Sequence, residues 1–453
     1  MKKFGKLLTV CVLLAMVVPS LAVLAQEGQI TLRVVGLEVV PEERETPLAI
    51  AKQAARTRFM EAHPNIFIES LETPPEFDTQ VLVDLAAGTA PDIWYQDAST
   101  LARLVDTGNI LDASVCLELV PELTLDRFSE GMLDIHLRDT GELWGLPDGG
   151  TPMVMYYNPE AVAKAGVEPP TSDWTWDDFL TFAQMTTLDS EGRNRLDPNF
   201  DEENVVQWGF RVRKWTFEWI YWVWQNGGDV ISPDLTTADG YLNSPESIEA
   251  IKFLRDLVLE YGVAPEPSTL DQLVQQFGFL EAFLRGEVVM FPRGHWEMVG
   301  LTNQESYTPE RVAVVGNPSK VNDVTVIYES GWVINAKVAE DPDKLLAACQ
   351  FVEELTDYEY QSTKVVTGLE ISANREAAAA AIEASAWPEI ERVFVEEAEN
   401  GRRNYGSIYA NWPVVEGILD SMMENILAGA DVEEEVAIAV EEIDRELQRS
   451  AGG

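Results

Sequence analysis

The first hundred residues of the chain alternate between short apolar runs of strand period and longer apolar runs of helical period. Pro64 and Gly88, which stop helices, follow the two helical runs. The predicted strands cover residues 30–34, 66–68 and 92–95, and the predicted helices between them cover residues 48–62 and 81–86. Strands that alternate with helices pair in parallel through right-handed crossovers, so this pattern predicts an α/β fold built on a parallel sheet.

The rest of the chain has a helix-rich middle and returns to strand character late. The expected helices cover residues 177–186, 216–226, 244–261, 273–285, 342–355, 413–427 and 432–447, and the expected strands cover 312–315, 324–327 and 332–334. A chain of 453 residues is too long for one ordinary core. Strands on both sides of a helical middle predict two lobes, between which the chain crosses more than once.

The N-terminus has the order of a secretory signal. Lys2, Lys3 and Lys6 precede an apolar run over residues 7–18, and small residues end the segment at Ala25. This order predicts a signal peptide over residues 1–25 and an extracytoplasmic protein, periplasmic, secreted or at the cell surface; an uncleaved anchor is the alternative. Cys11 lies inside the apolar run, which disfavours a lipoprotein signal.

The charge of the chain is strongly acidic. It has 77 Asp and Glu against 32 Lys and Arg, for a net charge of −45. Phosphate backbones would repel such a surface, so nucleic acid is excluded as a partner. The polar stretch over residues 189–203 could surround a calcium ion, but its spacing departs from a calcium-binding loop, and no metal or other cofactor is predicted. Beyond the signal segment only Cys116 and Cys349 remain, as one disulfide or as two free thiols.

Four groups of motifs follow one another along the chain. They are Leu-Ala-Ala-Gly-Thr-Ala-Pro-Asp-Ile at 85–93, Gly-Glu-Leu-Trp-Gly-Leu-Pro at 141–147 with Tyr-Tyr-Asn-Pro at 156–159, Phe-Leu-Arg-Gly-Glu-Val-Val-Met at 283–290 with Gly-His-Trp at 294–296, and Gly-Trp-Val-Ile at 331–334. In this order and spacing the chain resembles extracellular solute-binding protein family 1, the substrate-binding proteins of carbohydrate ABC importers that include maltodextrin-binding proteins.

The resemblance implies a two-lobed periplasmic-binding-protein-like fold (type II), with a multi-strand hinge and a ligand cleft between the lobes. On this basis, residues 26–148 and 316–365 form lobe one, and residues 149–315 and 366–453 form lobe two. The implied function is capture of a mono- or oligosaccharide by a monomer that is not an enzyme, followed by delivery to the membrane permease.

Sugar rings have apolar faces that pack on aromatic side chains and hydroxyl edges that need polar planar groups, so both kinds of residue are candidates. Trp296 and Trp412 match family positions that stack on sugars. Trp215 and Glu218 begin the aromatic cluster at 215–224. The remaining candidates follow predicted strands or lie near hinge crossings: Glu38, Gln96, Asp97, Asp148, Trp332 and Arg375. For each of them the alternative is a structural role, as a core tryptophan, a solvated acid or an ion-pair partner.

Two other functions remain open on the sequence. A binding protein for a polyamine, phosphodiester or peptide would share the fold, and the acidic segment between Gly36 and Ala49 departs from the best-known family members. A secreted glycoside hydrolase would also need tryptophans and a carboxylate pair. No nucleophile turn, phosphate loop or zinc pattern is present in the sequence.

Overall fold

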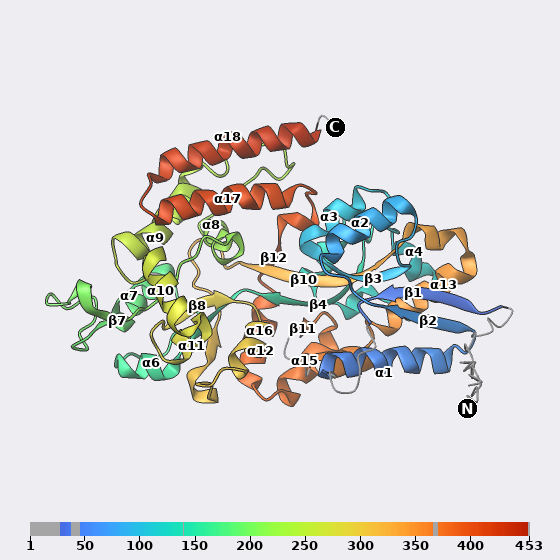
Figure 1. Cartoon of the computed structure of the whole chain (residues 1–453), viewed down its shortest axis with the longest axis horizontal. Helices are drawn as coiled ribbons and strands as arrows, with labels where there is room; N and C mark the ends of the chain where they lie inside the picture. The colour runs from blue at the N-terminus through green and yellow to red at the C-terminus, as the bar shows by residue number, and fades with distance from the viewer. Residues whose placement is uncertain (1–27, 38–45, 139, 366–369, 452–453) are drawn as a thin grey trace, which may run out of the picture.

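Two β-sheets covered by helices organise the chain, and a third sheet is a separate pair of short strands (Figure 1). The computed structural model describes residues 28–37, 46–138, 140–365 and 370–451. The predicted signal segment and Glu38 lie outside these described residues. The mixed arrangement of strands and helices confirms the predicted α/β class.

The larger sheet begins with the alternating units at the start of the chain. β1 (Ile30–Val35) pairs in parallel with β2 (Ile66–Leu71) and β3 (Ile93–Asp97), and α1 (Pro47–Ala62) and α2 (Phe77–Ala87) make the crossovers. α2 ends where Gly88 takes a left-handed conformation with φ +74°. The predicted parallel unit is therefore confirmed.

Later strands complete this sheet from distant parts of the chain. They are β4 (Leu146–Pro152), β10 (Thr325–Ile334), β11 (Ile371–Ser372) and β12 (Gly401–Arg403). β10 runs antiparallel to both β3 and β4 and lies between them, so the sheet is mixed and not purely parallel. The two strands predicted at 324–327 and 332–334 are parts of this single strand.

The smaller sheet has the order β8 (Met290–Arg293), β5 (Val154–Tyr157) and β9 (Ala313–Val315). Only Met153 separates β4 from β5, so the chain passes from one sheet directly into the other. The two sheets lie one after the other along the long axis of the molecule (Figure 1).

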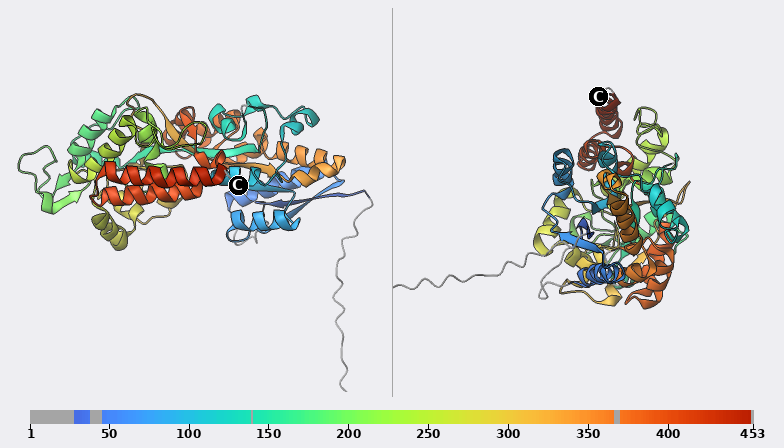
Figure 2. Two further views of the ribbon diagram at one scale, coloured as in Figure 1. Left: turned by 90° about the horizontal axis from the view of Figure 1, so that it is seen from above. Right: turned by 90° about the vertical axis from the view of Figure 1, so that its right-hand side faces the viewer.

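Helices cover the smaller sheet and extend the molecule beyond it. They include α6 (Pro159–Lys164), α7 (Trp176–Thr186), α8 (Ile220–Gln225), α9 (Pro245–Leu259), α10 (Pro267–Phe277), α11 (Phe279–Leu284) and α12 (Glu297–Thr302). The helix predicted at 273–285 is divided because Gly278 adopts φ +78°. α17 (Trp412–Leu427) and α18 (Val432–Ala451) run side by side in both views (Figures 1 and 2).

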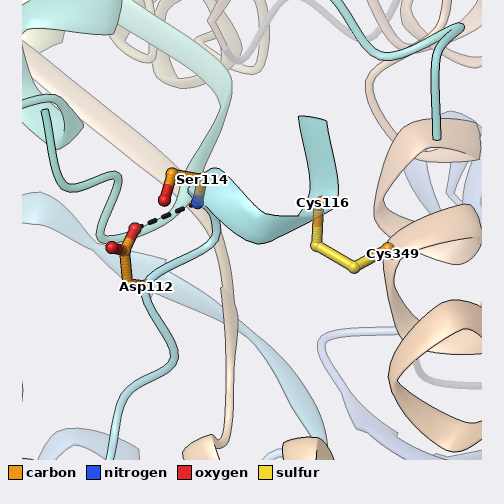
Figure 3. Close-up of a disulfide and its surroundings, with 4 residues drawn as sticks. All are labelled: Asp112, Ser114, Cys116 and Cys349. Carbon is orange, nitrogen blue, oxygen red and sulfur yellow. Dashed lines mark hydrogen bonds between the residues drawn. A yellow bond between two sulfur atoms is a disulfide. The ribbon is translucent and has the colours of Figure 1, made fainter. Parts of the chain in front are cut away.

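Further helices pack on the larger sheet. They are α3 (Leu101–Val105), α4 (Ser114–Leu119), α5 (Glu130–His136), α13 (Pro342–Glu354), α14 (Tyr358–Lys364), α15 (Arg375–Ala384) and α16 (Pro388–Ala398). Cys116 of α4 and Cys349 of α13 form a disulfide with a Cα–Cα distance of 5.1 Å (Figure 3). The structure thus contains the disulfide, not two free thiols.

The hydrophobic cores only partly follow the predicted division into segments. One core contains Trp219, Trp222 and Trp224 of the aromatic cluster, and helices α9, α17 and α18 close it. The other core joins the larger sheet to one face of the smaller sheet, through residues such as Tyr156 and Phe394. In addition, β11 and β12 pair with strands of the larger sheet although residues 366–453 were predicted to belong to lobe two.

Hydrogen bonds to Asp189 organise the acidic stretch. Asp189, at the end of β6 (Leu188–Asp189), accepts hydrogen bonds from the backbone N–H groups of Glu191, Arg193 and Asp201 and from the Arg193 side chain. Desolvation opposes ionisation of Asp189, but these donors outweigh it and lower its pKa to about 2. β7 (Val205–Gln207) pairs with β6. Among the described residues, no cluster of three or more His, Cys, Asp or Glu could hold a metal.

None of the helices in the described ranges is long and apolar enough to cross a membrane.

Candidate ligand-binding cleft

A cleft of about 420 Å³ opens where the two sheets meet. β3, β4 and β10 of the larger sheet form one side, and loops at the ends of the smaller sheet's elements form the other. The lining residues are Tyr95, Asp97, Thr151, Tyr328, Glu329, Ser330 and Glu370 on the first side, and Trp215, Arg293 and Trp296 on the second. Its position at the carboxyl end of β3 agrees with the general placement of ligands in open α/β sheets.

Aromatic rings form one wall of the cleft. Tyr328 lies at the centre of this group, with ring centroids 6.0 Å from Trp215 and 5.4 Å from Trp296. Trp296 meets Tyr328 edge to face, at an interplanar angle of 83°. All three rings are half-buried, so they are packed from behind and still present surface to the cleft.

The place of Trp296 depends on the residue two positions before it. A β carbon on Gly294 would lie 2.0 Å from Cζ3 of Trp296, so only glycine allows the indole to fold back over the chain. His295 between them is buried, and its backbone N–H donates to Oγ1 of Thr151 at 2.6 Å. The glycine of the Gly-His-Trp motif is therefore needed to place the Trp296 ring in the cleft wall.

Arg293 is the cation that lines the cleft, and two carboxylates hold it. Its Nη1 donates to Oε1 of Glu218 at 2.7 Å, and its Nε donates to Oε2 of Glu297 at 2.6 Å. Its guanidinium also lies over the Trp215 ring, 5.1 Å from the centroid. Glu218 is itself buried and accepts a second hydrogen bond from Arg211 at 2.7 Å. Glu218 therefore lies behind the cleft wall, where it fixes Arg293.

Carboxylates also line the cleft. Asp97 accepts a hydrogen bond from the backbone N–H of Ser99 at 2.7 Å, and desolvation raises its pKa. Glu370 accepts from the hydroxyl of Tyr95 at 3.1 Å and pairs with Lys364 at 2.5 Å. Tyr95 and Asp97 alternate with buried Gln96 along β3, so their side chains share the face that looks into the cleft.

A further acid lies behind Trp215. Glu416 of α17 is half-buried and hydrogen-bonded to the Trp215 side chain. Desolvation and the neighbouring Asp420 raise the pKa of Glu416 to about 7. Asp97 adds to this shift from across the cleft, so carboxyl groups of α17 and of β3 act on each other here.

The structure brings Asp97, Trp215 and Trp296 together in the cleft, with Glu218 directly behind them. Five other predicted side chains do not line it. Gln96 is buried and donates to Asp78 and Thr100, because strand alternation turns it away from Asp97. Trp412 is buried in the core of α17 and packs 4.9 Å from Tyr405.

The other three side chains also have structural partners. Asp148 is fully buried beneath the cleft, where it pairs with Lys364 and accepts from the Trp332 indole at 2.9 Å. Trp332, also fully buried, packs its ring edge to face against Tyr95. Arg375 is exposed elsewhere and donates to the Phe128 carbonyl at 2.5 Å. Glu38 lies outside the described residues.

Several cleft residues were missed from the sequence. They include Tyr95, Arg293, Tyr328 and Glu370, and Glu416, which contacts Trp215 outside the lining, was missed as well. A signal existed for Tyr95, because the period of two that selects Asp97 on β3 also selects Tyr95 and excludes Gln96. The others come from chain segments whose meeting depends on tertiary packing, and no local pattern marks them.

Comparisons with known proteins agree that this chain is similar to solute-binding proteins. A family model described as bacterial extracellular solute-binding protein matches residues 54–392. The structure is similar to that of the sugar-binding protein MalE from Xanthomonas citri, with a TM-score of 0.75 and 14% identity over 93% of this chain and 98% of that one. It is also similar to an ABC substrate-binding protein from Listeria monocytogenes in complex with cycloalternan, with a TM-score of 0.71 and 22% identity over 93% and 99% of the two chains.

A sequence relative shares a shorter segment. The arabinooligosaccharide-binding protein of Halalkalibacterium halodurans is 27% identical over 143 residues, which cover 32% of this chain and 28% of that protein. The match thus spans less than two thirds of that relative. The structural similarities, in contrast, extend over nearly the whole chain and show the two-lobed fold.

Proposed function

Because this chain belongs to the family of bacterial extracellular solute-binding proteins, we propose that it captures a mono- or oligosaccharide between its lobes and delivers it to the membrane permease of an ABC importer. The names of similar proteins support the choice of ligand, since they include a sugar-binding MalE, a cycloalternan complex and an arabinooligosaccharide-binding protein. Within this proposal the protein binds sugar outside the cytoplasm as a monomer and does not convert it.

The observation that carries the proposal is the combination of aromatic rings and carboxylates in one cleft. Trp215, Trp296 and Tyr328 present ring surface on which the apolar face of a pyranose could pack. Asp97 and Glu370 offer acceptor oxygens to hydroxyl groups at the ring edge. A volume of about 420 Å³ suits a ligand of one to a few sugar rings.

We propose that the lobes close by bending where the chain passes between the sheets. The first passage is Met153, between β4 and β5, and the second is the segment 316–324 between β9 and β10. A third lies between β12, on the larger sheet, and α17, in the core of the aromatic cluster. In this arrangement lobe one is residues 26–148 and 316–365, as expected from the sequence, together with β11 and β12. Closure would enclose the ligand between Trp215 and Trp296 on one lobe and Tyr95 and Asp97 of β3 on the other.

The first test replaces the stacking residue. Trp296→Ala should weaken binding of the preferred sugar by about 1 kcal/mol or more, roughly fivefold, because the ligand loses an aromatic face. Isothermal titration calorimetry would measure this loss. Trp387→Ala is the matched control, since Trp387 is half-buried outside the cleft and its indole donates to Tyr307 at 2.9 Å. Equal affinity in wild type and Trp296→Ala would remove Trp296 from the site.

A ligand screen tests the class of solute. Thermal unfolding should shift upwards with at least one saccharide, because a ligand that binds only the folded state stabilises it. A shift with polyamines, phosphodiesters or peptides and with no saccharide would contradict the proposal. Incubation of the purified protein with oligosaccharides should leave them intact, and cleavage products would show a glycoside hydrolase instead.

A further inference from the structure

One cation lines the cleft and retains free hydrogen-bond donors. Among the lining residues that the structure describes, Arg293 is the only Lys or Arg. Its Nε donates to Glu297 at 2.6 Å and its Nη1 donates to Glu218 at 2.7 Å. Nη2 donates to no acceptor within the described part of the chain, and the side chain is 19% exposed. The two N–H groups of Nη2 are therefore available to a ligand.

A cluster behind the wall fixes the position of Arg293. The buried carboxylate of Glu218 accepts hydrogen bonds from Arg211 and Arg213 as well as from Arg293. Three guanidinium groups thus share two carboxylates, Glu218 and Glu297, within ion-pair distance. Because Arg293 alone of the three lines the cleft, it presents positive charge there. Its orientation is set before a ligand arrives, which lowers the entropic cost of binding.

Asp97 supplies the opposite charge across the cleft. Its Oδ1 accepts from the backbone N–H of Ser99, and no Lys or Arg in the described ranges forms an ion pair with it. Both charges act on the hydroxyl of Tyr328. Desolvation raises the pKa of this phenol, Asp97 raises it further, and Arg293 opposes the rise. A donor and an acceptor of opposite charge therefore serve the same part of the cleft.

A sugar hydroxyl group fits this pair better than a charged group does. A guanidinium only donates hydrogen bonds and an ionised carboxylate only accepts them, whereas a hydroxyl does both. A carboxylate on the ligand would pair with Arg293 but would be repelled by Asp97, and an ammonium group would meet the reverse. A ring that lacks the hydroxyl would leave both side chains without a partner in a partly desolvated site.

We propose that Arg293 and Asp97 together recognise one hydroxyl group of the sugar ring: Nη2 of Arg293 donates to its oxygen, and Asp97 accepts a hydrogen bond from it. Arg293 is then a specificity-determining residue for neutral sugars, and Glu218 and Glu297 are positioning residues that act through it. This inference rests on the proposed function, because it specifies which feature of a sugar the same cleft selects.

The test first replaces Arg293 by lysine, which keeps the positive charge beside Glu218 and Glu297 but lacks the Nη2 donors. The probes are glucose, galactose, arabinose and maltotriose. In calorimetry, the sugar that binds wild type best should bind Arg293→Lys about tenfold more weakly. Arg285→Lys is the matched control, because Arg285 pairs with Glu281 at the same spacing of four residues and lies outside the cleft. Thermal unfolding without sugar checks that both variants fold.

Monodeoxy forms of the same sugar distinguish a direct contact from a structural role. In wild type, removal of the recognised hydroxyl should weaken binding about tenfold or more. In Arg293→Lys the same removal should cost about fivefold less, because one of the two hydrogen bonds to that hydroxyl is already lost. Glucuronate and galacturonate should bind wild type more weakly than glucose and galactose, since Asp97 repels a carboxylate.

The outcomes separate this inference from the proposed function. Unchanged sugar affinity in Arg293→Lys would overturn the inference and leave the function standing. So would a deoxy penalty of equal size in wild type and variant, or a uronate that binds more tightly than its neutral sugar. If no saccharide binds wild type, both proposals fail together.

Discussion

Glu397 is a buried carboxyl group next to one of the passages between the sheets. It lies on α16, is 9% exposed, and its Oε1 would be 2.3 Å from a β carbon on Gly316. The backbone N–H of Asn317 donates to it, but no Lys or Arg pairs with it among the described residues. Desolvation, helped by Asp323, raises its pKa to about 8. The carboxyl is therefore protonated in the folded protein at neutral pH.

This shift predicts a pH dependence of stability. An acid whose pKa is higher in the folded state than the usual 4.5 retains its proton longer when folded, so unfolding becomes easier as pH rises from about 4.5 to 8. Glu397→Gln should remove this contribution of up to about 1.4 kcal/mol per pH unit and leave the protein more stable than wild type at pH 8. Urea unfolding at several pH values would measure it, with exposed Glu399→Gln as control. Parallel pH curves for wild type and Glu397→Gln would contradict the assignment.

At the scale of residues, the sequence predicts which residue types bind a ligand better than it predicts where their side chains point. Asp97, Trp215 and Trp296 were selected by residue type and position, and their side chains lie in the cleft. Trp412 has the same chemistry, but it faces the core because α17 packs against α18. Which face of a helix is covered depends on tertiary contacts, and one sequence contains no direct record of them.

At the scale of elements, the disulfide ties α4 to α13 across 233 residues of chain (Figure 3). Both cysteines are fully buried in the core of the larger sheet. Closing so long a loop restricts the unfolded chain, so the bond stabilises the folded state.

The double variant Cys116→Ala with Cys349→Ala should lower the free energy of unfolding by about 2–4 kcal/mol. Denaturant unfolding would measure the loss, and wild type treated with a reductant should lose a similar amount. A double variant as stable as wild type would show that the bond contributes nothing to stability. Sugar affinity should be retained, because neither cysteine lines the cleft.

Helices with a strong apolar periodicity were predicted well. The residues at which helices and strands are interrupted were not. α9, α13 and α17 begin and end within a few residues of the expected helices. The helix expected at 273–285 breaks at Gly278, where the backbone adopts a positive φ. The strand β10 runs through Gly331, where its register against β4 shifts, and a β carbon on Gly331 would lie 2.7 Å from the His136 ring.

At the scale of the whole molecule, ligand binding should be coupled to closure. A sugar that contacts both walls of the cleft favours the closed state over the open one, so saturation should reduce the radius of gyration. Small-angle scattering with and without ligand would detect the change. At a ligand concentration 100 times Kd, stability should also rise by about 2.7 kcal/mol. Tight binding with an unchanged radius would contradict coupling between binding and closure.

The two-lobed architecture followed from the order of motifs, whereas the assignment of segments to lobes stays a prediction. Residues 371–372 and 401–403 belong to the larger sheet because they pair with β4 and β10, and such short strands carry too few residues to show a pattern. The local periodicity of a sequence does not reveal strand pairing between residues so far apart.

The central position of β10 has a consequence for the time course of folding. Ile93 of β3 pairs with Ile334 of β10, so one edge of the early parallel unit stays uncovered until most of the chain has been synthesised. Contacts between residues so far apart in sequence form slowly, because a long loop must close first. The unit of β1, β2 and β3 is therefore expected to stay incompletely folded during biosynthesis. Its open edge at β3 is covered only when β10 has been made.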